Sequence, residues 1–403
     1  MNVFVARQPI FDKKQKVVAY ELLFRSNREN MYSGIDADQA TKDVIANSFL
    51  TIGMDKLTGG KKAFINFTES LIKSDIIETL PKEVVVVEIL ENIKIDDQII
   101  EICKRLKRQG YILALDDFVF EPSYEPLLEL VDIIKVDFLI TKGAERKELI
   151  KKFKTKKIRF LAEKVETIQE YKEAVSYGYS YFQGYFFSKP VILSATEMPS
   201  YKPSHLALIK ELSKHEIDFH YLENIIKKDI SLSYKLLKYI NSASFGFRKK
   251  LDSILQALIL LGKEDLSKWV YLIALREMGE NKPSEIMTSS VIRAKFCEML
   301  SPKLGLGSRA SDMFFMGLLS QINAITNLPM ENAIEEMPIS EDVKAGLLGA
   351  DNQFRDALEL IIGYETGDWH KFSLYAKKLN FEESEAPELY IKSIEWVNGF
   401  MQF

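Results

Sequence analysis

The chain has 403 residues, and 54 lysines and arginines against 58 aspartates and glutamates give a formal net charge of −4. Hydrophobic residues make up 47% and charged residues 28%, which excludes wholesale disorder and predicts two or three folded domains, at roughly 150 residues each. The near balance of charge predicts no general attraction to nucleic acid or to an anionic membrane surface.

The sequence further predicts a cytoplasmic protein. No apolar run reaches the ~20 residues that a membrane-spanning helix needs. The opening residues MNVFVARQPIF lack the basic flank and the long apolar stretch of a secretory signal. The two cysteines, Cys103 and Cys297, lie far apart in helix-like patterns, which argues against a disulfide framework and against a thiolate zinc site.

Two short strands with polar residues are expected near the N-terminus. In YELLFR (20–25) the alternation of a strand places Glu21 and Arg25 on one face. Their burial is costly unless they meet each other, a metal or a charged ligand. INFT (65–68) adds Asn66 at the end of a further strand. Both strands therefore carry groups that need a polar partner.

Residues 83–186 alternate β-rich runs with helical patterns. The runs have the continuous Val, Ile and Leu content of strands buried on both faces, and they are EVVVVEIL (83–90), YILALDDF (111–118), VDIIKVDF (131–138), IRFLAEKV (158–165) and YSYFQGYF (179–186). Intervals of 28, 19, 28 and 20 residues, each the length of one strand–helix unit, separate Glu88, Asp116, Lys135, Glu163 and Gln183. This spacing favours a TIM-like (β/α)₈ barrel, whose active-site mouth lies at the C-terminal strand ends. A doubly wound sheet, which places ligands at the same ends, stays open.

Strand signals fade after the last of these runs. SATEMPSYKPS (194–204) is rich in Ser and Pro and is typical of a linker, whereas residues 253–275 show helical spacing behind the N-cap Ser253. We therefore expect an α/β barrel domain over residues 1–195, a linker over 196–204 and an all-helical domain over 205–403.

The expected barrel gathers carboxylate and amide side chains at one mouth, namely Glu21, Asn66, Glu88, Asp116, Asp117 and Glu163. Cations are needed to hold this negative charge together, and oxygen ligands favour Mg²⁺ or Mn²⁺ over zinc. Two such ions ~3.5–4 Å apart activate water and stabilise the leaving oxygen of a phosphodiester. Lys135 would orient the water or bind phosphate, and Arg25 would pair with a phosphate oxygen. This chemistry predicts a metal-dependent phosphodiester hydrolase.

Eight segments resemble, in order and spacing, those of EAL-domain cyclic di-GMP phosphodiesterases: RQPIFD, YELLFR, INFT, VEILE, LDDF, IKVD, AEKVE and QGYFFSKP. The resemblance covers roughly residues 1–195 and implies hydrolysis of cyclic di-GMP to the linear dinucleotide pGpG. It implies metal ligands at Glu21, Asn66, Glu88, Asp116 and Asp117. It implies Glu163 as general base with Lys135 and Gln183 beside it in catalysis, substrate binding by Arg25, Asp137 and Glu166, and loop anchoring by Glu91.

Two features depart from the family's pattern. After Asp-Asp-Phe the family has a glycine-containing loop involved in dimer contacts and in placing the metal-binding aspartates, whereas VFEPSYEP (119–126) has two prolines and no glycine. Lys164 replaces a family glycine, and it is expected either to pair with Glu163 or to point to solvent. Loss of such supporting contacts typically costs ~10–100-fold in affinity or activity. Activity is therefore left open, as is a homodimer.

The segment KYINSASFGFRKKLDSILQALILLG (238–262) resembles the core of HDOD domains, helical relatives of HD-type metal phosphohydrolases. An active HD site needs a His-Asp pair, and none of the four histidines precedes an aspartate. The resemblance therefore implies a non-catalytic module that binds a signalling protein or regulates the barrel.

Two functions thus stay open. One is a Mg²⁺- or Mn²⁺-dependent cyclic di-GMP phosphodiesterase whose helical domain relays or receives a signal. The other is an inactive adaptor whose barrel binds cyclic di-GMP, or nothing, and whose helical domain binds a protein partner. The complete set of site residues supports the enzyme, and the altered loop with Lys164 supports the adaptor.

Overall fold

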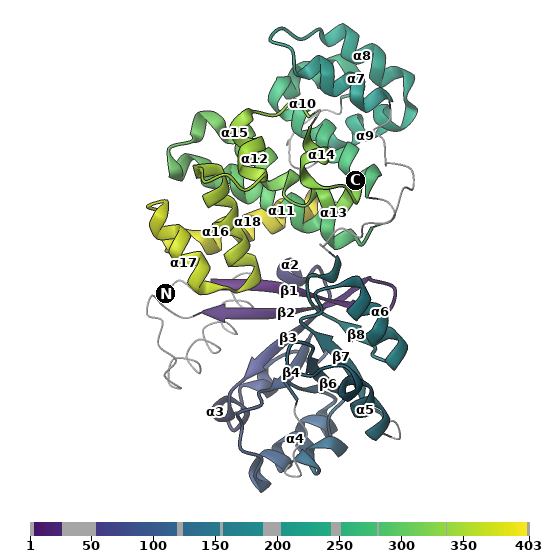
Figure 1. Cartoon of the computed structure of the whole chain (residues 1–403), viewed down its shortest axis with the longest axis vertical. Coiled ribbons are helices and arrows are strands. Elements are labelled where there is room, and N and C mark those ends of the chain that lie inside the picture. Colours follow the sequence, from purple (N-terminus) through teal and green to yellow (C-terminus); the bar gives the residue numbers. More distant parts are fainter. Residues whose placement is uncertain are drawn as a thin grey trace. The chain divides into compact units, whose positions relative to one another are not determined.

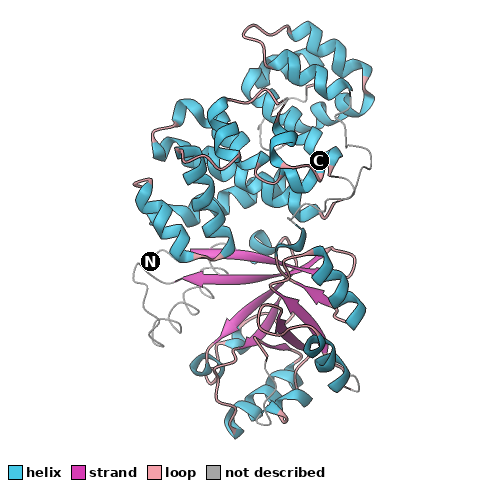
Figure 2. Cartoon of the chain, viewed as in Figure 1, coloured by secondary structure: helices cyan, strands magenta, loops and turns pink. Residues whose placement is uncertain are grey.

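The computed structural model describes residues 4–25, 54–118, 124–153, 156–187, 203–242, 251–279, 282–335 and 337–400. The chain forms two compact units. The first comprises Met1–Lys189, Ile362–Ser373 and Ser384–Pro387, and the second comprises Pro190–Ile361, Leu374–Glu383 and Glu388–Phe403. The described strands all belong to the first unit, whereas the described part of the second is built from helices (Figures 1 and 2).

Eight strands close into a barrel in the first unit. They follow one another around the barrel in chain order, as β1 (Phe4–Asp12), β2 (Val17–Arg25), β3 (Lys62–Phe67), β4 (Val85–Ile89), β5 (Ile112–Leu115), β6 (Ile133–Asp137), β7 (Arg159–Glu163) and β8 (Tyr181–Phe182). Strands β2 to β8 are parallel to their neighbours, but β1 is antiparallel to both β2 and β8. The expected barrel is confirmed, with a reversed first strand that the sequence pattern did not indicate.

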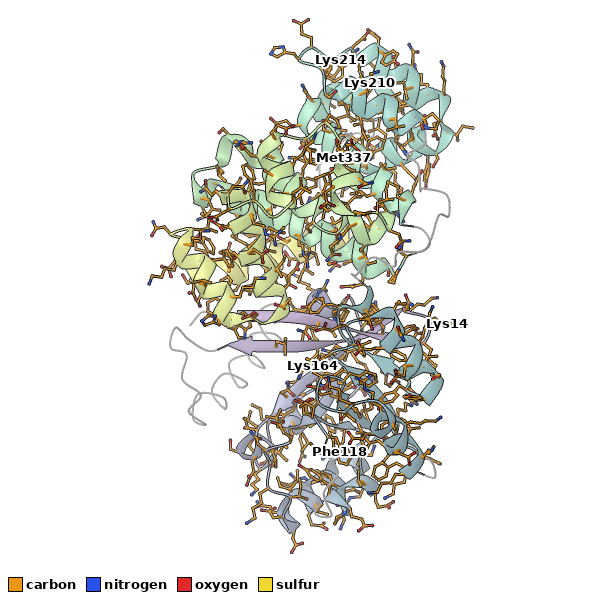
Figure 3. The ribbon with its side chains drawn as sticks, in the orientation of Figure 1. Lys14, Phe118, Lys164, Lys210, Lys214 and Met337 are labelled. Carbon is orange, nitrogen blue, oxygen red and sulfur yellow. The ribbon has the colours of Figure 1, made fainter. Side chains whose placement is uncertain are left out.

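Helices and short 3₁₀ turns connect the strands. They are α2 (Met54–Thr58), α3 (Glu69–Ile72), η2 (Ile77–Thr79), α4 (Asp97–Gln109), η4 (Leu127–Glu129), α5 (Ala144–Lys152), α6 (Ile168–Tyr177) and η5 (Tyr185–Phe187). Helix α4 begins where the Asp96 carboxylate accepts a hydrogen bond from the Ile99 N–H, and it ends at Gly110 in the left-handed conformation (φ 97°). Phe118 follows β5 and is labelled in Figure 3. Its ring packs against the rings of Tyr124 and Phe153.

An apolar plug closes the inside of the barrel. One residue from each of seven strands contributes to it: Ile10, Ala19, Phe64, Val86, Ala114, Ile133 and Leu161. Tyr181 of β8 packs against the same cluster. Because side chains on one face of a strand recur every second residue, the next inward position on each strand lies one layer nearer the mouth.

The second unit contains most of the C-terminal helices. They begin with α7 (Pro203–Leu212), α8 (Phe219–Lys228), α9 (Ile230–Ile240), α10 (Ile254–Met278) and α11 (Ser284–Leu300). They continue through η7 (Ser301–Leu304), η8 (Gly307–Arg309), α12 (Ala310–Leu319), α13 (Ile322–Thr326), α14 (Met330–Ile334) and α15 (Glu341–Leu347). The predicted cap is present at Ser253, and Gly262 breaks α10 with φ 68° and ψ 179°. Among the described helices, none is long and apolar enough to span a bilayer.

Three further helices contribute to both units: α16 (Gln353–Thr366), α17 (Trp369–Lys378) and, after the turn η9 (Glu383–Glu385), α18 (Ala386–Phe400). Within the first unit, the ring of Phe4 on β1 contacts the rings of Tyr364, Trp369 and Phe372, with centroids 6.0–6.4 Å apart. The Val5 N–H also donates to the Tyr364 hydroxyl at 3.3 Å. Residues 362–373 therefore pack on the barrel's first strand, although they lie far from it in sequence.

Candidate functional site

The mouth of the barrel is lined by polar residues placed two positions beyond the apolar plug. Along the parallel strands this offset leads from the plug to Glu21, Asn66, Glu88, Asp116, Lys135, Glu163 and Gln183. On the antiparallel β1 the same offset runs backwards, from Ile10 to Gln8. All eight strands thus place one polar side chain at the same level, as a barrel's inward-facing layers require.

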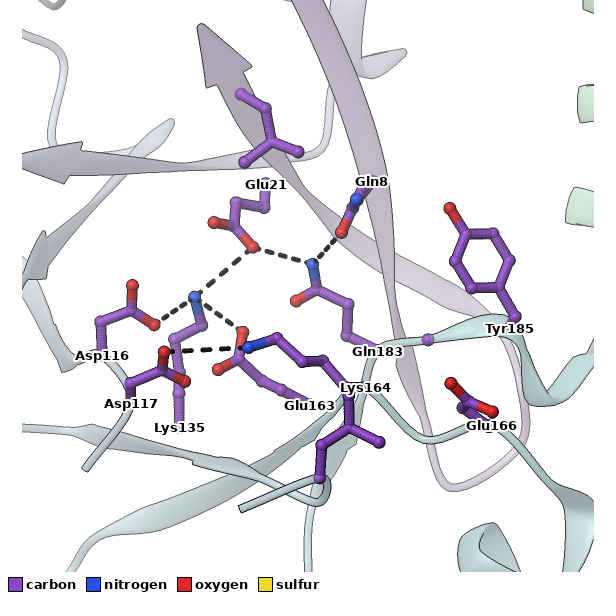
Figure 4. A pocket seen from close by; sticks show the side chains of 13 residues that line it. Gln8, Glu21, Asp116, Asp117, Lys135, Glu163, Lys164, Glu166, Gln183 and Tyr185 are labelled. Carbon is purple, nitrogen blue, oxygen red and sulfur yellow. Dashed lines mark hydrogen bonds and ion pairs between the residues drawn. The ribbon is translucent and has the colours of Figure 1, made fainter. Parts of the chain in front are cut away.

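A single buried ammonium lies among four of these carboxylates. The Nζ atom of Lys135, which is 1% exposed, is 2.7 Å from Glu88, 2.8 Å from Asp116, 2.9 Å from Glu163 and 3.4 Å from Glu21. Figure 4 shows the contacts with Asp116, Glu163 and Glu21. Burial by itself would lower the pKa of Lys135, but the surrounding carboxylates outweigh it and raise that pKa well above its usual value. Lys135 is therefore held as a cation.

Amide side chains fix the orientation of Glu21. Asn66 Nδ2 donates to Glu21 Oε1 at 3.1 Å, and Gln183 Nε2 donates to Glu21 Oε2 at 2.8 Å. Gln183 Nε2 also donates to Gln8 Oε1 at 2.8 Å. Gln8 Nε2 in turn donates to the carbonyl of Thr366, in the segment packed on β1. Sequence reasoning did not assign Gln8 to the site, although the quoted segment RQPIFD contains it. The offset from the plug identifies Gln8 once the reversal of β1 is known.

The surplus of negative charge shifts the protonation of the buried carboxyl groups. Burial, reinforced by Asp116 and Glu21 and opposed by Lys135, raises the pKa of Glu163 to about 8. Burial likewise raises the pKa of Glu88 well above its usual range, and burial together with Asp116 raises the pKa of Asp117. Burial therefore disfavours the charged form of each of these groups, compared with an ordinary carboxyl group, as long as no further cation balances them.

Three of the carboxylates fit a divalent cation. Asp116, Asp117 and Glu163 each offer an oxygen, and the three oxygens lie within 4.8 Å of one another. Carboxylate oxygens are the donors that Mg²⁺ and Mn²⁺ prefer. All three residues line a pocket of about 590 Å³, together with Gln8, Glu21, Leu23, Lys135, Leu139, Lys164, Glu166, Gln183, Gly184 and Tyr185. Asn66 and Glu88, also predicted as metal ligands, lie at the same mouth around Glu21 and Lys135.

The remaining predicted residues take different positions. Asp137 Oδ1 accepts hydrogen bonds from the Leu139 and Ile140 N–H groups, so this carboxylate holds the turn after β6. Glu91 is exposed, and its backbone carbonyl accepts a hydrogen bond from the Tyr124 hydroxyl at 2.9 Å. The side chain of Arg25 and most of the altered loop, residues 119–123, lie outside the described residues.

Lys164 is exposed, as one of the two sequence expectations had it, but its ammonium also meets carboxylates of the mouth. Its ammonium pairs with Asp137 Oδ2 rather than with Glu163, and it lies 3.8 Å from Asp117 Oδ2. The side chain is half-exposed (48%), so it reaches the mouth along its surface instead of pointing away from it. The reason is local, because the backbone of Lys164 adopts a positive φ of 52° that ends the alternation of β7.

Known proteins resemble the chain over nearly its full length. The EAL domain family matches residues 2–190 and the HDOD domain family matches residues 198–345. The uncharacterized protein YuxH of Bacillus subtilis (strain 168) is 42% identical, over 100% of this chain and 99% of YuxH. The cyclic di-GMP phosphodiesterase CdgJ of Vibrio cholerae serotype O1 is 33% identical, over 98% of this chain and 92% of CdgJ. The chain therefore belongs to the EAL–HDOD family, as both sequence resemblances implied.

A solved structure also matches part of the chain. The manganese and cyclic di-GMP complex of Klebsiella pneumoniae BlrP1 is 25% identical, over 46% of this chain and 55% of that one, with a TM-score of 0.39.

Proposed function

We propose that the chain is a Mg²⁺- or Mn²⁺-dependent phosphodiesterase that hydrolyses cyclic di-GMP to pGpG. The observation that carries this proposal is the convergence of Glu21, Glu88, Asp116 and Glu163 on Lys135 at the barrel mouth. The full-length similarity to CdgJ, named as a cyclic di-GMP phosphodiesterase, supports the substrate.

The residues of the mouth would take different roles in the reaction. A bound divalent cation would be held by Asp116 and Asp117 beside Glu163, and it would supply a water of lowered pKa and neutralise phosphate charge. Lys135, which is 2.9 Å from Glu163 Oε1, keeps that carboxylate directed into the pocket. Glu163 is then placed to accept the proton of the attacking water. Gln183 and Asn66 hold Glu21 in one orientation, which keeps the shared site ordered.

Further roles complete the proposal. Glu166 lines the pocket and Asp137 borders it through Lys164, so both would lie near a nucleotide that binds there. Substrate contact by Arg25, loop anchoring by Glu91 and homodimer formation stay predictions, as does the domain division at residues 195 and 205. For the helical domain we propose a regulatory or partner-binding role without catalysis, and for the protein a cytoplasmic location.

Metal-dependent product formation tests the proposal. Full-length protein is stripped with EDTA, supplied with Mg²⁺ or Mn²⁺, and incubated with cyclic di-GMP, and pGpG is separated by chromatography. We expect Glu163→Gln to lose about 100-fold or more of the rate, because the proton acceptor is gone. Glu148→Gln, the same change at an exposed position of α5, should leave the rate unchanged. Equal rates in the two variants would show that Glu163 is not the base.

One observation favours a second candidate, the inactive adaptor. Lys164 already places a positive charge on two aspartates of the mouth. If that charge keeps divalent cations out, the barrel binds cyclic di-GMP without releasing pGpG, and the helical domain passes the signal to a protein partner. Equilibrium binding of cyclic di-GMP without turnover would support this function.

A further inference from the structure

We propose that Lys164 is a resident cation of the site, which occupies the Asp117–Asp137 side of the mouth and weakens the binding of a divalent cation at Asp116, Asp117 and Glu163. This inference takes the cation site from the proposed function but does not require that the site hydrolyses cyclic di-GMP.

The backbone turn at residue 164 carries the ammonium to the mouth. Glu163 is the last residue of β7, and in a continued strand the next side chain would face away from the barrel interior. Lys164 instead has φ 52°, a conformation that non-glycine residues rarely adopt. Its ammonium reaches the ends of the two preceding strands, where it pairs with Asp137. It also approaches Asp117 (Figure 4).

Neighbouring contacts hold this turn in place. The Val165 N–H donates to the Gln183 carbonyl at 3.0 Å, and the Phe186 N–H donates to the Val165 carbonyl at 3.0 Å. Gly184 packs directly on Val165, since a Cβ atom there would lie 2.3 Å from the Val165 oxygen. On the other side, the turn after β6 fixes the Asp137 carboxylate that receives the ammonium. Lys164 is therefore directed at the aspartates by a packed rim.

Competition with a divalent cation follows from these positions. Asp117 belongs to the group of three carboxylates that fit a cation, and its Oδ2 atom is 3.8 Å from the Lys164 ammonium. A cation bound there would be repelled by a like charge a few ångströms away, and Lys164 would also compete for the Asp117 oxygen. Because the lysine is half-exposed, water screens part of this repulsion. We expect a loss of cation affinity of about tenfold.

Binding of Mn²⁺ to the full-length protein, without nucleotide, tests this inference. Free Mn²⁺ is measured by electron paramagnetic resonance during a titration at pH 8. Lys164→Gln should bind Mn²⁺ about tenfold more tightly than the wild type, and Lys164→Arg should stay close to the wild type. Lys104→Gln removes an exposed charge from α4 and serves as the control for net charge. Lys164→Asn, a residue that tolerates positive φ, provides a second neutral variant if Lys164→Gln is unfolded.

The outcomes separate this inference from the proposed function. Tighter Mn²⁺ binding by the neutral variants, with no turnover in the wild type, would support the resident cation and contradict the phosphodiesterase. Turnover in the wild type, with no tightening in the neutral variants, would overturn the resident cation alone. Absence of Mn²⁺ binding in all variants would overturn it as well.

Discussion

Lys135 stabilises a group of carboxylates that would otherwise repel one another. Its ammonium is within 3.4 Å of Glu21, Glu88, Asp116 and Glu163. A buried pair that loses one partner leaves an uncompensated charge, at a typical cost of about 3–5 kcal/mol. The same negative charge attracts a divalent cation, so lysine and metal stabilise the mouth by one mechanism.

Replacing Lys135 with an uncharged residue should therefore leave the repulsion between the surrounding carboxylates unbalanced. Lys135→Met is expected to lower the free energy of unfolding by about 3–5 kcal/mol at pH 8 in EDTA, and Mn²⁺ should restore part of the loss. Urea unfolding with and without Mn²⁺ measures both effects. Lys104→Met removes an exposed ion pair on α4 and should cost less than ~1 kcal/mol. Equal losses in the two variants would contradict the central role of Lys135.

Glu163 should make the stability of the cation-free protein depend on pH. Its pKa is about 8 in the folded protein and 4.5 as an ordinary carboxyl group. The folded state therefore holds more protons than the unfolded state between these values, and the free energy of unfolding falls as pH rises from about 4.5 to about 8. Glutamine keeps the neutral form, so Glu163→Gln should match the wild type near pH 4.5 and exceed its stability at pH 8.5 by at least ~1 kcal/mol.

Urea unfolding in EDTA at the two pH values measures this difference. Glu148→Gln, at an exposed position on α5, should show no such dependence on pH. A Glu163→Gln variant that is less stable than the wild type at pH 8.5 would show that ionised Glu163 stabilises the fold.

The sequence predicts which residues gather at this site, but it does not predict which of them contact Lys135 and Lys164. Glu88 and Asp116 were predictable as neighbours because both stand at the ends of parallel strands, and such ends share one edge. The ion-pair partners of Lys135 and Lys164 depend on the positions of the two ammonium groups in the folded structure. A periodic pattern does not show that Lys135 points inward in the layer beyond the plug, nor that Lys164 turns sideways at positive φ.

The rim between β7 and β8 leaves no room for a side chain at residue 184. Gly184 has φ 136°, and a Cβ atom there would lie 2.3 Å from the Val165 oxygen and 2.5 Å from the Val165 nitrogen. Only glycine fits such a close approach of two backbones. The same contact fixes the segment that carries Glu163 and Lys164, so packing at this rim determines the geometry of the site.

Gly184→Ala should therefore destabilise the barrel by at least ~2 kcal/mol. Gly178→Ala is the matched control, because Gly178 also has positive φ, at 108°, but its nearest heavy atom is Ile150 Cγ2 at 3.6 Å. This second change should cost about 1 kcal/mol, from backbone strain alone. Urea unfolding compares the two variants, and similar losses would argue against the close approach to Val165.

Elements determined by neighbouring residues in the sequence were predictable, whereas features that depend on contacts between distant parts of the chain were not. The apolar face of α4 and its C-cap Gly110 are visible in a short window of sequence, and both are present. The reversal of β1 depends on pairing with β2 and β8, which no local pattern reports. Gln8 joins the site only through that reversal.

The first compact unit is built from the N-terminal part of the chain and two short segments near its C-terminal end. Residues 362–373 supply Tyr364, Trp369 and Phe372 to a cluster around Phe4, and Thr366 accepts the hydrogen bond from Gln8. Composition indicates a linker after the barrel, but it does not reveal that a later segment returns to the first strand. The Thr366 carbonyl is therefore linked to the site by a chain of hydrogen bonds. The chain runs through Gln8 to Gln183 and from Gln183 to Glu21.

The family and the site together define the central claim, which is that this EAL–HDOD chain turns over cyclic di-GMP. The most direct measurement is the number of pGpG molecules formed per protein chain, with full-length protein, Mn²⁺ and a large excess of cyclic di-GMP. We predict many product molecules per chain with Mn²⁺ and none in EDTA. Binding of cyclic di-GMP without release of pGpG at any Mn²⁺ concentration would contradict the claim and identify the barrel as a receptor.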